Sequence, residues 1–125
     1  MQKVVITGHD LTVDQIIAVC REGAEVVLSD ESREKILASR QVVNELVEER
    51  KVVYGITTGF GKFSDVVISQ DECKLLQKNL IITHAVGAGD PFKEDIARGI
   101  LLLRVNSLSN GFSGICLETV ETMIA

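Results

Sequence analysis

The sequence predicts a mainly α-helical protein with a few short strands. Three observations support this: apolar residues recur at helical spacing, two capping boxes precede helices, and β-branched residues form only short runs. The 125 residues fit one domain or part of one. Hydrophobic residues make up 46% and aromatic residues only 4%, so the core is expected to consist of Leu, Ile, Val and Ala.

The chain is expected to begin with two short strands separated by a helix. The strands are predicted over residues 4–6 and 25–28, where β-branched residues are bounded by turn residues. A Gly-His-Asp turn ends the first strand. The helix starts after Thr12, because Gln15 three residues later completes a capping box, and Gly23 is expected to end it.

A glycine-rich loop follows a long helix predicted over residues 31–50. Residues 51–54 are β-prone and lead into the stretch Val52–Gly61, which holds Tyr54, the only tyrosine of the chain. The stretch is too apolar for an ordinary surface turn. We therefore predict a functional loop that positions Tyr54, a possible proton-transfer group. Three glycines are expected to shape its backbone: Gly55, Gly59 and Gly61.

Three more helical segments are predicted after the loop. The first starts at a capping box on Ser69 and runs to about His84, which continues its apolar stripe. The second covers about residues 92–109, with Pro91 at the first helical position. The third starts at Ser113, and the sequence stops within it. We expect residues 1–125 to be a single N-terminal segment of a longer protein, cut within this helix.

Composition excludes several classes of function. A net charge of −5 argues against nucleic acid and anionic membrane as partners, and no apolar run is long enough to span a bilayer. The chain has three cysteines without a Cys-x-x-Cys pair and only two histidines, so we expect no metal site and reduced thiols in a cytoplasmic protein. No chemistry is assigned to His9 or to the cysteines, which are Cys20, Cys73 and Cys116.

Three blocks of the sequence resemble one known family. Residues 53–61 are similar to the Tyr-Gly-x-x-Thr-Gly-Phe-Gly signature of aromatic amino acid ammonia-lyases. Residues 76–87 and 103–114 resemble the next two blocks of the same family, in the same order. Among its members the histidine ammonia-lyases are the most similar, because they share a small hydroxyl residue followed by histidine, here Thr83 and His84.

This resemblance implies the N-terminal part of the ammonia-lyase fold, which is helical and similar to that of aspartase and fumarase. It implies non-oxidative deamination of L-histidine to urocanate in a cytoplasmic homotetramer, as a step of histidine degradation. The base would be Tyr54, and His84 and Thr83 would bind the substrate. The electrophile of the family, methylidene-imidazolone, forms from an Ala-Ser-Gly tripeptide that this sequence lacks. The chain alone is therefore expected to be inactive.

Several alternatives remain open at this point. The chain could belong to a tyrosine ammonia-lyase or an aminomutase of the same family, or it could be a non-catalytic helical interaction module. From composition alone, Tyr54 would more simply close a loop, and His84 would be a satisfied core residue or a helix-end cap. Arg104 shares a helical face with apolar residues and is expected to be partly buried in a structural ion pair.

Overall fold

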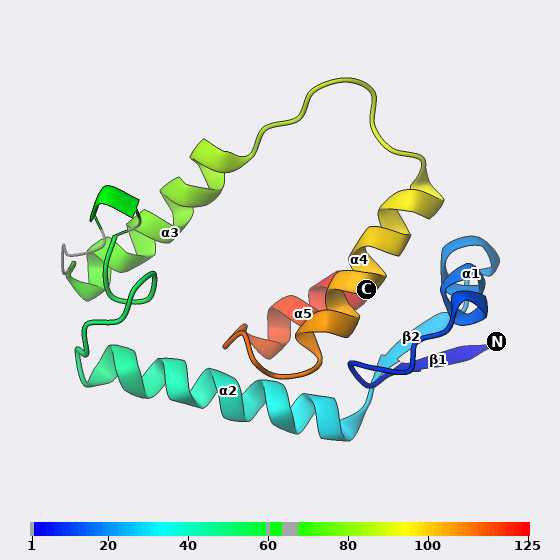
Figure 1. Ribbon diagram of the computed structural model, residues 1–125, viewed down its shortest axis with the longest axis horizontal. Helices are drawn as coiled ribbons and strands as arrows, with labels where there is room; N and C mark the ends of the chain where they lie inside the picture. The colour runs from blue at the N-terminus through cyan, green and yellow to red at the C-terminus, as the bar shows by residue number, and fades with distance from the viewer. Residues whose placement is uncertain (1, 60, 64–67) are drawn as a thin grey trace. The chain divides into compact units, whose positions relative to one another are not determined.

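The computed structural model of the chain describes residues 2–59, 61–63 and 68–125, and within them it is mainly helical (Figure 1). This confirms the predicted fold class. The strands are β1 (Lys3–Ile6) and β2 (Glu25–Leu28), and a short 3-10 helix, η1, covers Gly61–Phe63. The α-helices are α1 (Val13–Glu22), α2 (Asp30–Glu48), α3 (Gln70–His84), α4 (Glu94–Leu108) and α5 (Leu117–Ile124).

The two strands form one parallel pair joined by helix α1. Val4 lies opposite Val26 and Ile6 lies opposite Leu28, with both residues of β1 fully buried. A parallel pair needs a crossover connection, and the ten residues of α1 provide it. One βαβ unit is therefore present at the start of the chain, and the described residues after it continue as helices and loops.

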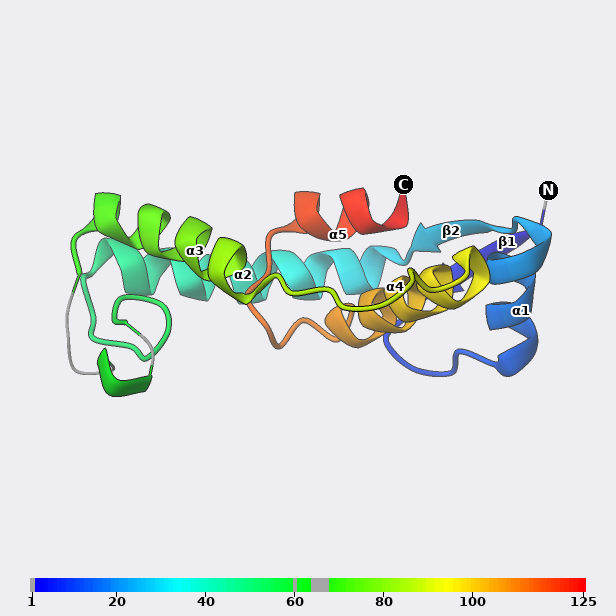
Figure 2. The same ribbon diagram turned by 90° about the horizontal axis from the view of Figure 1, so that it is seen from above.

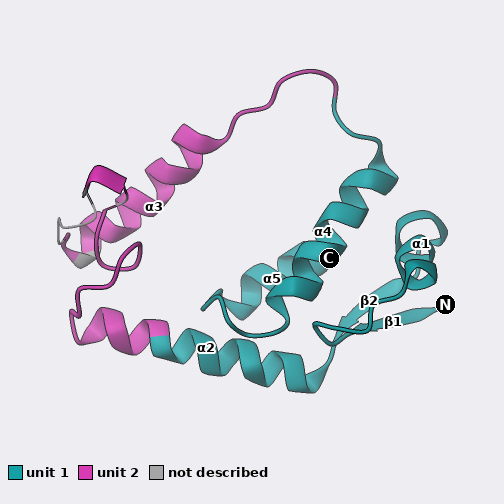
Figure 3. Cartoon of the chain, in the orientation of Figure 1, with its two compact units in different colours: residues 1–42, 91–125 teal, residues 43–90 magenta. Residues whose placement is uncertain are grey.

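Two compact units divide the chain, shown in different colours in Figure 3. The first consists of residues 1–42 and 91–125, and α4 packs there against both α1 and α5 (Figure 2). Its core is aliphatic, as the composition predicted. The buried apolar side chains that form it are Val4, Ile6, Val19, Leu28, Ile36, Leu102, Val105 and Val120. The second unit, residues 43–90, contains the end of α2, the glycine-rich loop and α3.

Local capping explains where α1 and α3 begin. The Thr12 hydroxyl accepts the Gln15 N–H and the Gln15 side chain accepts the Thr12 N–H. Ser69 and Glu72 make the equivalent pair of contacts at α3. Each box satisfies two backbone donors that have no partner within the helix. Gly23 follows α1 in the left-handed region with a φ of 73°, as expected of a C-terminal glycine.

Two predicted helix starts are wrong, and one β-prone segment does not form a strand. Helix α4 begins at Glu94 after Lys93, not at Pro91, and acidic residues in its first turn favour the helix dipole there. Helix α5 begins at Leu117, because Gly114 has a φ of 67° that no α-helix contains. Residues 51–54 form no strand. The carbonyl of Val53 instead accepts N–H groups three and four residues later, which turns the chain.

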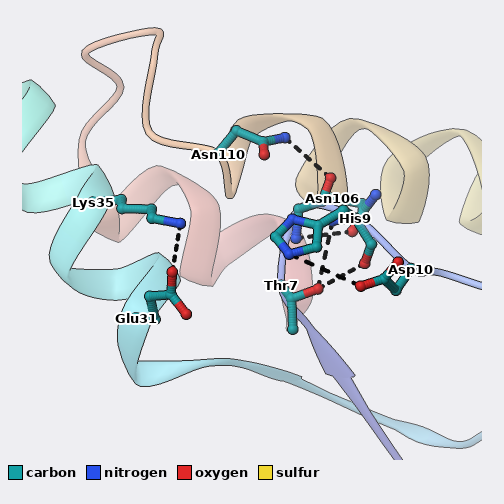
Figure 4. Close-up of polar contacts among 8 residues, drawn as sticks. Thr7, His9, Asp10, Glu31, Lys35, Asn106 and Asn110 are labelled. Atoms are coloured by element: carbon teal, nitrogen blue, oxygen red, sulfur yellow. Dashed lines mark hydrogen bonds and ion pairs between the residues drawn. The ribbon is translucent and has the colours of Figure 1, made fainter.

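The turn after β1 is held by two asparagines of the α4 region (Figure 4). The Asn106 Oδ1 atom accepts the Gly8 N–H at 3.2 Å, and the Asn110 Nδ2 atom donates to the Gly8 carbonyl at 3.1 Å. Nearby, the Nε2 atom of His9 lies 3.9 Å from the Oδ2 atom of Asp10. The backbone N–H and the backbone carbonyl of Gly8 are therefore both bonded to residues about a hundred positions away in the sequence.

The connection between α4 and α5 is fixed to α2 through its glycines. Gly114 donates its N–H to the Ser39 hydroxyl at 2.9 Å, and its carbonyl accepts from Arg40 at 3.3 Å. Gly111, with a φ of 73°, lies so close to Lys35 that an added Cβ would meet the Lys35 Cβ atom at 2.6 Å and its backbone at 2.7 Å. This close approach excludes a side chain at position 111.

We predict that Gly111→Ala destabilises the chain much more than Gly23→Ala. Both glycines have a φ of 73°, so each alanine has the left-handed penalty of about 1–2 kcal/mol. Only position 111 adds a backbone clash, worth roughly 1–3 kcal/mol more, since a Cβ at Gly23 meets nothing within 4 Å. Urea denaturation of the two variants measures the difference. Equal losses of stability would contradict the close packing of Gly111 on Lys35.

We also predict that Ser69→Ala raises the pKa of the Glu72 carboxyl. The hydroxyl and then the N–H of Ser69 donate to this carboxylate and hold its pKa below the usual 4.5. A lowered folded-state pKa gives stabilisation that is present above pH 4.5 and is lost as the pH falls through the lowered value. An NMR titration of Glu72 measures the change. Thr12→Ala is the matched control, because it breaks the other capping box and should leave the Glu72 titration unmoved.

Candidate functional site

The candidate site lies in the second unit, around the loop that follows α2. Two of the three predicted loop-shaping glycines have left-handed backbones, with φ values of 73° at Gly55 and 57° at Gly61. Gly59 is buried and has no positive φ. Phe60, which belongs to the family-like signature, is outside the described residues.

Tyr54 lies on the surface of this loop with 62% of its area exposed. Its phenolic oxygen accepts the Gly61 N–H at 3.3 Å. The side chain therefore folds back along its own loop and brings residues 54 and 61 together. The predicted Val52–Gly61 stretch is closed on itself by this contact.

Two threonines between Tyr54 and Gly61 were missed as functional candidates. Thr57 and Thr58 are 6% and 1% exposed, and both hydroxyls bond to the loop backbone. The sequence contained a usable signal. A glycine-rich apolar loop has many backbone groups to satisfy, and Thr57 and Thr58 carry the short side-chain hydroxyls that can bond to nearby backbone groups.

His84 is the last residue of α3, and its ring is oriented by the turn before it. The Nδ1 atom lies 2.9 Å from the Leu80 carbonyl and 3.1 Å from the Thr83 hydroxyl, whose own proton is directed to the Asn79 carbonyl at 2.8 Å. A carbonyl can only accept, so Nδ1 must carry a proton. In the neutral ring, Nε2 then has the lone pair and acts as an acceptor.

An open hollow of about 680 Å³ lies between the glycine-rich loop and the end of α3. It is lined by Gly61, Leu80, Ile81 and His84. His84, the predicted substrate contact, lines the hollow directly, whereas Tyr54, the predicted base, is joined to it only through the Gly61 N–H that its phenolic oxygen accepts. The Thr83 hydroxyl, in contrast, bonds to the carbonyls of its own helix. Gly55 and Gly59 are not among the lining residues.

Two other hollows lack a comparable set of groups. One of about 550 Å³ in the first unit is mostly apolar, and its charged residues have partners: Arg98 pairs with Glu94 at 2.8 Å and Glu25 with Lys3 at 3.5 Å. Another of about 460 Å³ in the second unit lies behind the loop. Its lining includes the charged residues Arg50 and Asp71 but neither Tyr54 nor His84, and the polar atoms of Thr57 and Cys73 in it already bond to loop carbonyls.

Other predicted features can be placed as well. Arg104 is exposed, not partly buried, because the buried stripe of α4 runs through Leu102 and Val105 and the predicted stripe was offset from it. Across residues 2–59, 61–63 and 68–125, no group of three or more His, Cys, Asp or Glu side chains could hold a metal. No described helix has both the length and the apolar character needed to cross a membrane. The three cysteines are half-buried free thiols.

Comparison with known proteins points to one family. The sequence model of the aromatic amino acid lyases matches residues 11–125. The histidine ammonia-lyase of Caldanaerobacter subterraneus is 56% identical over 124 residues, and that of Alkaliphilus oremlandii is also 56% identical. Each match covers 99% of this chain and 24% of the relative.

Solved structures agree with this similarity. A histidine ammonia-lyase from Trypanosoma cruzi matches with a TM-score of 0.91 and 41% identity, over 98% of this chain and 24% of that one. A tyrosine aminomutase from Streptomyces globisporus matches with a TM-score of 0.89 and 33% identity, over 98% and 23%. The chain thus spans about a quarter of the length of the relatives it matches. Because the family model covers nearly the whole sequence, the chain belongs to the aromatic amino acid lyase family.

Proposed function

We propose that this chain is the N-terminal segment of a histidine ammonia-lyase and contributes one side of its active site. The complete protein would remove ammonia from L-histidine without oxidation and release urocanate. The observation that carries the proposal is the hollow lined by His84 and Gly61, together with the hydrogen bond from the Gly61 N–H to the Tyr54 oxygen. The names of relatives that are 56% identical support the choice of substrate.

The chain's own residues would supply a base and a binding contact. In its phenolate form, Tyr54 would take the proton from the β-carbon of the substrate and become the neutral phenol, which requires a group held at the reacting atom. The Nε2 atom of His84 would accept a hydrogen bond from a ring N–H of the substrate. Thr83 would assist by accepting from Nδ1, at 3.1 Å, so that the ring keeps its orientation.

The electrophile of the proposed enzyme would come from outside these residues. Methylidene-imidazolone forms from Ala-Ser-Gly, and the 125 residues contain no such tripeptide. The residues present therefore cannot form the group, and it would belong to a later part of the protein. Because homotetrameric lyases of this kind share their sites between subunits, the proposal includes such an assembly. A cytoplasmic location is also proposed, and the three free thiols support it.

A tyrosine-specific enzyme of the same family is the second candidate. The match to a tyrosine aminomutase at 33% identity favours it. The higher identity to histidine ammonia-lyases and the Thr83–His84 pair favour the first candidate. The two differ in the ring contact, since a phenol and an imidazole place their polar atoms at different distances from the reacting carbon.

We predict that Tyr54→Phe lowers turnover about 10²- to 10⁴-fold, the usual contribution of a general base. The test uses a hybrid in which this chain replaces the matched quarter of the Caldanaerobacter enzyme, with urocanate followed by absorbance. Thr122→Ala is the control, because Thr122 lies in the first unit and its hydroxyl bonds only within α5. Near-normal turnover of Tyr54→Phe would remove Tyr54 from the base role.

We predict that changing Thr83-His84 to His-Leu shifts preference from L-histidine towards L-tyrosine by about two orders of magnitude, because a polar ring contact left unpaired is costly. His84→Gln is the matched variant, since its amide oxygen can still accept near the Nε2 position. The ratio of kcat/KM for the two substrates measures the shift in the same hybrid. An unchanged ratio would contradict the ring contact.

A further inference from the structure

Neither described strand, β1 or β2, lies beside the loop that carries Tyr54. The loop backbone has one single-residue β-bridge at Thr58, and the Thr57 carbonyl accepts the Ile68 N–H at 3.3 Å. Residues 51–54 belong to no described strand, and Tyr54 is 62% exposed, with its phenolic oxygen accepting the Gly61 N–H. The backbone on either side of Tyr54 also sets where this residue lies. The hydrogen bonds of that backbone show which residues set it.

Thr57 fixes the segment before Tyr54. Its hydroxyl donates to the Lys51 carbonyl at 2.5 Å and accepts the Val53 N–H at 2.9 Å. The Thr57 N–H also donates to the Val53 carbonyl at 3.0 Å. The buried Thr57 hydroxyl thus donates to Lys51 and accepts from Val53, and both of these residues lie in the segment that leads to Tyr54.

Thr58 fixes the segment after Tyr54. Its hydroxyl accepts the Gly55 N–H at 3.3 Å and donates to the Gly59 carbonyl at 3.0 Å. The N–H groups immediately before and after Tyr54, on Val53 and Gly55, therefore both bond to a threonine hydroxyl. The residues on either side of Tyr54 are thus each held by a threonine side chain that comes later in the sequence.

We infer that Thr57 and Thr58 are positioning residues that hold Tyr54 at the reacting atom, with Thr57 the stronger of the two. The inference rests on the proposed function for its catalytic consequence. Their hydroxyls, not their bulk, carry the role, because each hydroxyl both donates to and accepts from the loop backbone. A buried threonine serving only to fill space would be replaceable by valine, which has nearly the same shape.

The first test measures the loop directly in the 125-residue chain. Thr57→Val should speed hydrogen exchange of the Val53 amide at least about 10-fold, and Thr58→Val should do the same at Gly55, because each amide loses its acceptor. Thr57→Ser keeps the hydroxyl and should leave exchange within about 2-fold of the parent chain. Thr122→Val, in α5, is the control for a threonine-to-valine change elsewhere. Unchanged exchange at Val53 in Thr57→Val overturns the inference, whatever the chain's function.

The second test measures catalysis in the hybrid lyase. Thr57→Val should lower kcat about 10- to 100-fold with KM within about 2-fold, because a base displaced by about 1 Å loses rate without losing substrate affinity. Thr57→Ser should restore most of kcat. In a Tyr54→Phe background, Thr57→Val should cost nothing further, since it acts through the missing base.

The two tests separate failure of this inference from failure of the proposed function. If the parent hybrid has no lyase activity, the proposed function fails, and the exchange rates still decide whether the threonines hold the loop. If the hybrid is active but Thr57→Val lowers kcat equally with and without the Tyr54 hydroxyl, the threonine does not act through Tyr54. That result would overturn the inference and leave the proposed function standing.

Discussion

The second unit depends on one constraint, which is that its loop must satisfy its own backbone hydrogen bonds. In a sheet, neighbouring strands supply the hydrogen-bond partners of the backbone, but neither described strand, β1 or β2, lies beside residues 51–59. Thr57 and Thr58 provide the missing partners from within the loop, and left-handed glycines allow the chain to turn back towards them. In the loop so formed, the Tyr54 phenolic oxygen accepts the Gly61 N–H at 3.3 Å.

The first unit is stabilised in a different way. Its core joins two strands and parts of four helices through aliphatic side chains that are far apart in sequence. Fixed polar contacts then set the connections, as at Gly8 and Gly114. A unit with such long-range packing tolerates small surface changes, whereas a locally bonded loop can be altered by loss of one hydroxyl.

Much of the fold could be predicted from sequence because its signals are local. Thr12 and Ser69 cap helices through residues three positions away, so the sequence contains both partners of each box. The prediction placed the start of α4 at Pro91 from residue type alone. Where a helix begins also depends on packing, and Phe92, which would lie in the first turn of the predicted helix, is 73% exposed and packs little. The burial of α4 could not be predicted, since its apolar residues surround the helix and only the tertiary neighbours select Leu102 and Val105.

The candidate site was predictable only in part, for the same reason. Tyr54 and His84 stand out by residue type, but the hollow lined by His84 and Gly61, and the bond that joins Tyr54 to Gly61, depend on how the loop folds. The hollow is open, and the described residues that line it, Gly61, Leu80, Ile81 and His84, all belong to the second unit. Enzymes that remove a weakly acidic proton enclose the substrate so that charges act in a water-poor site. One wall cannot do this, so a lyase built on this chain must bring further walls to Tyr54 and His84.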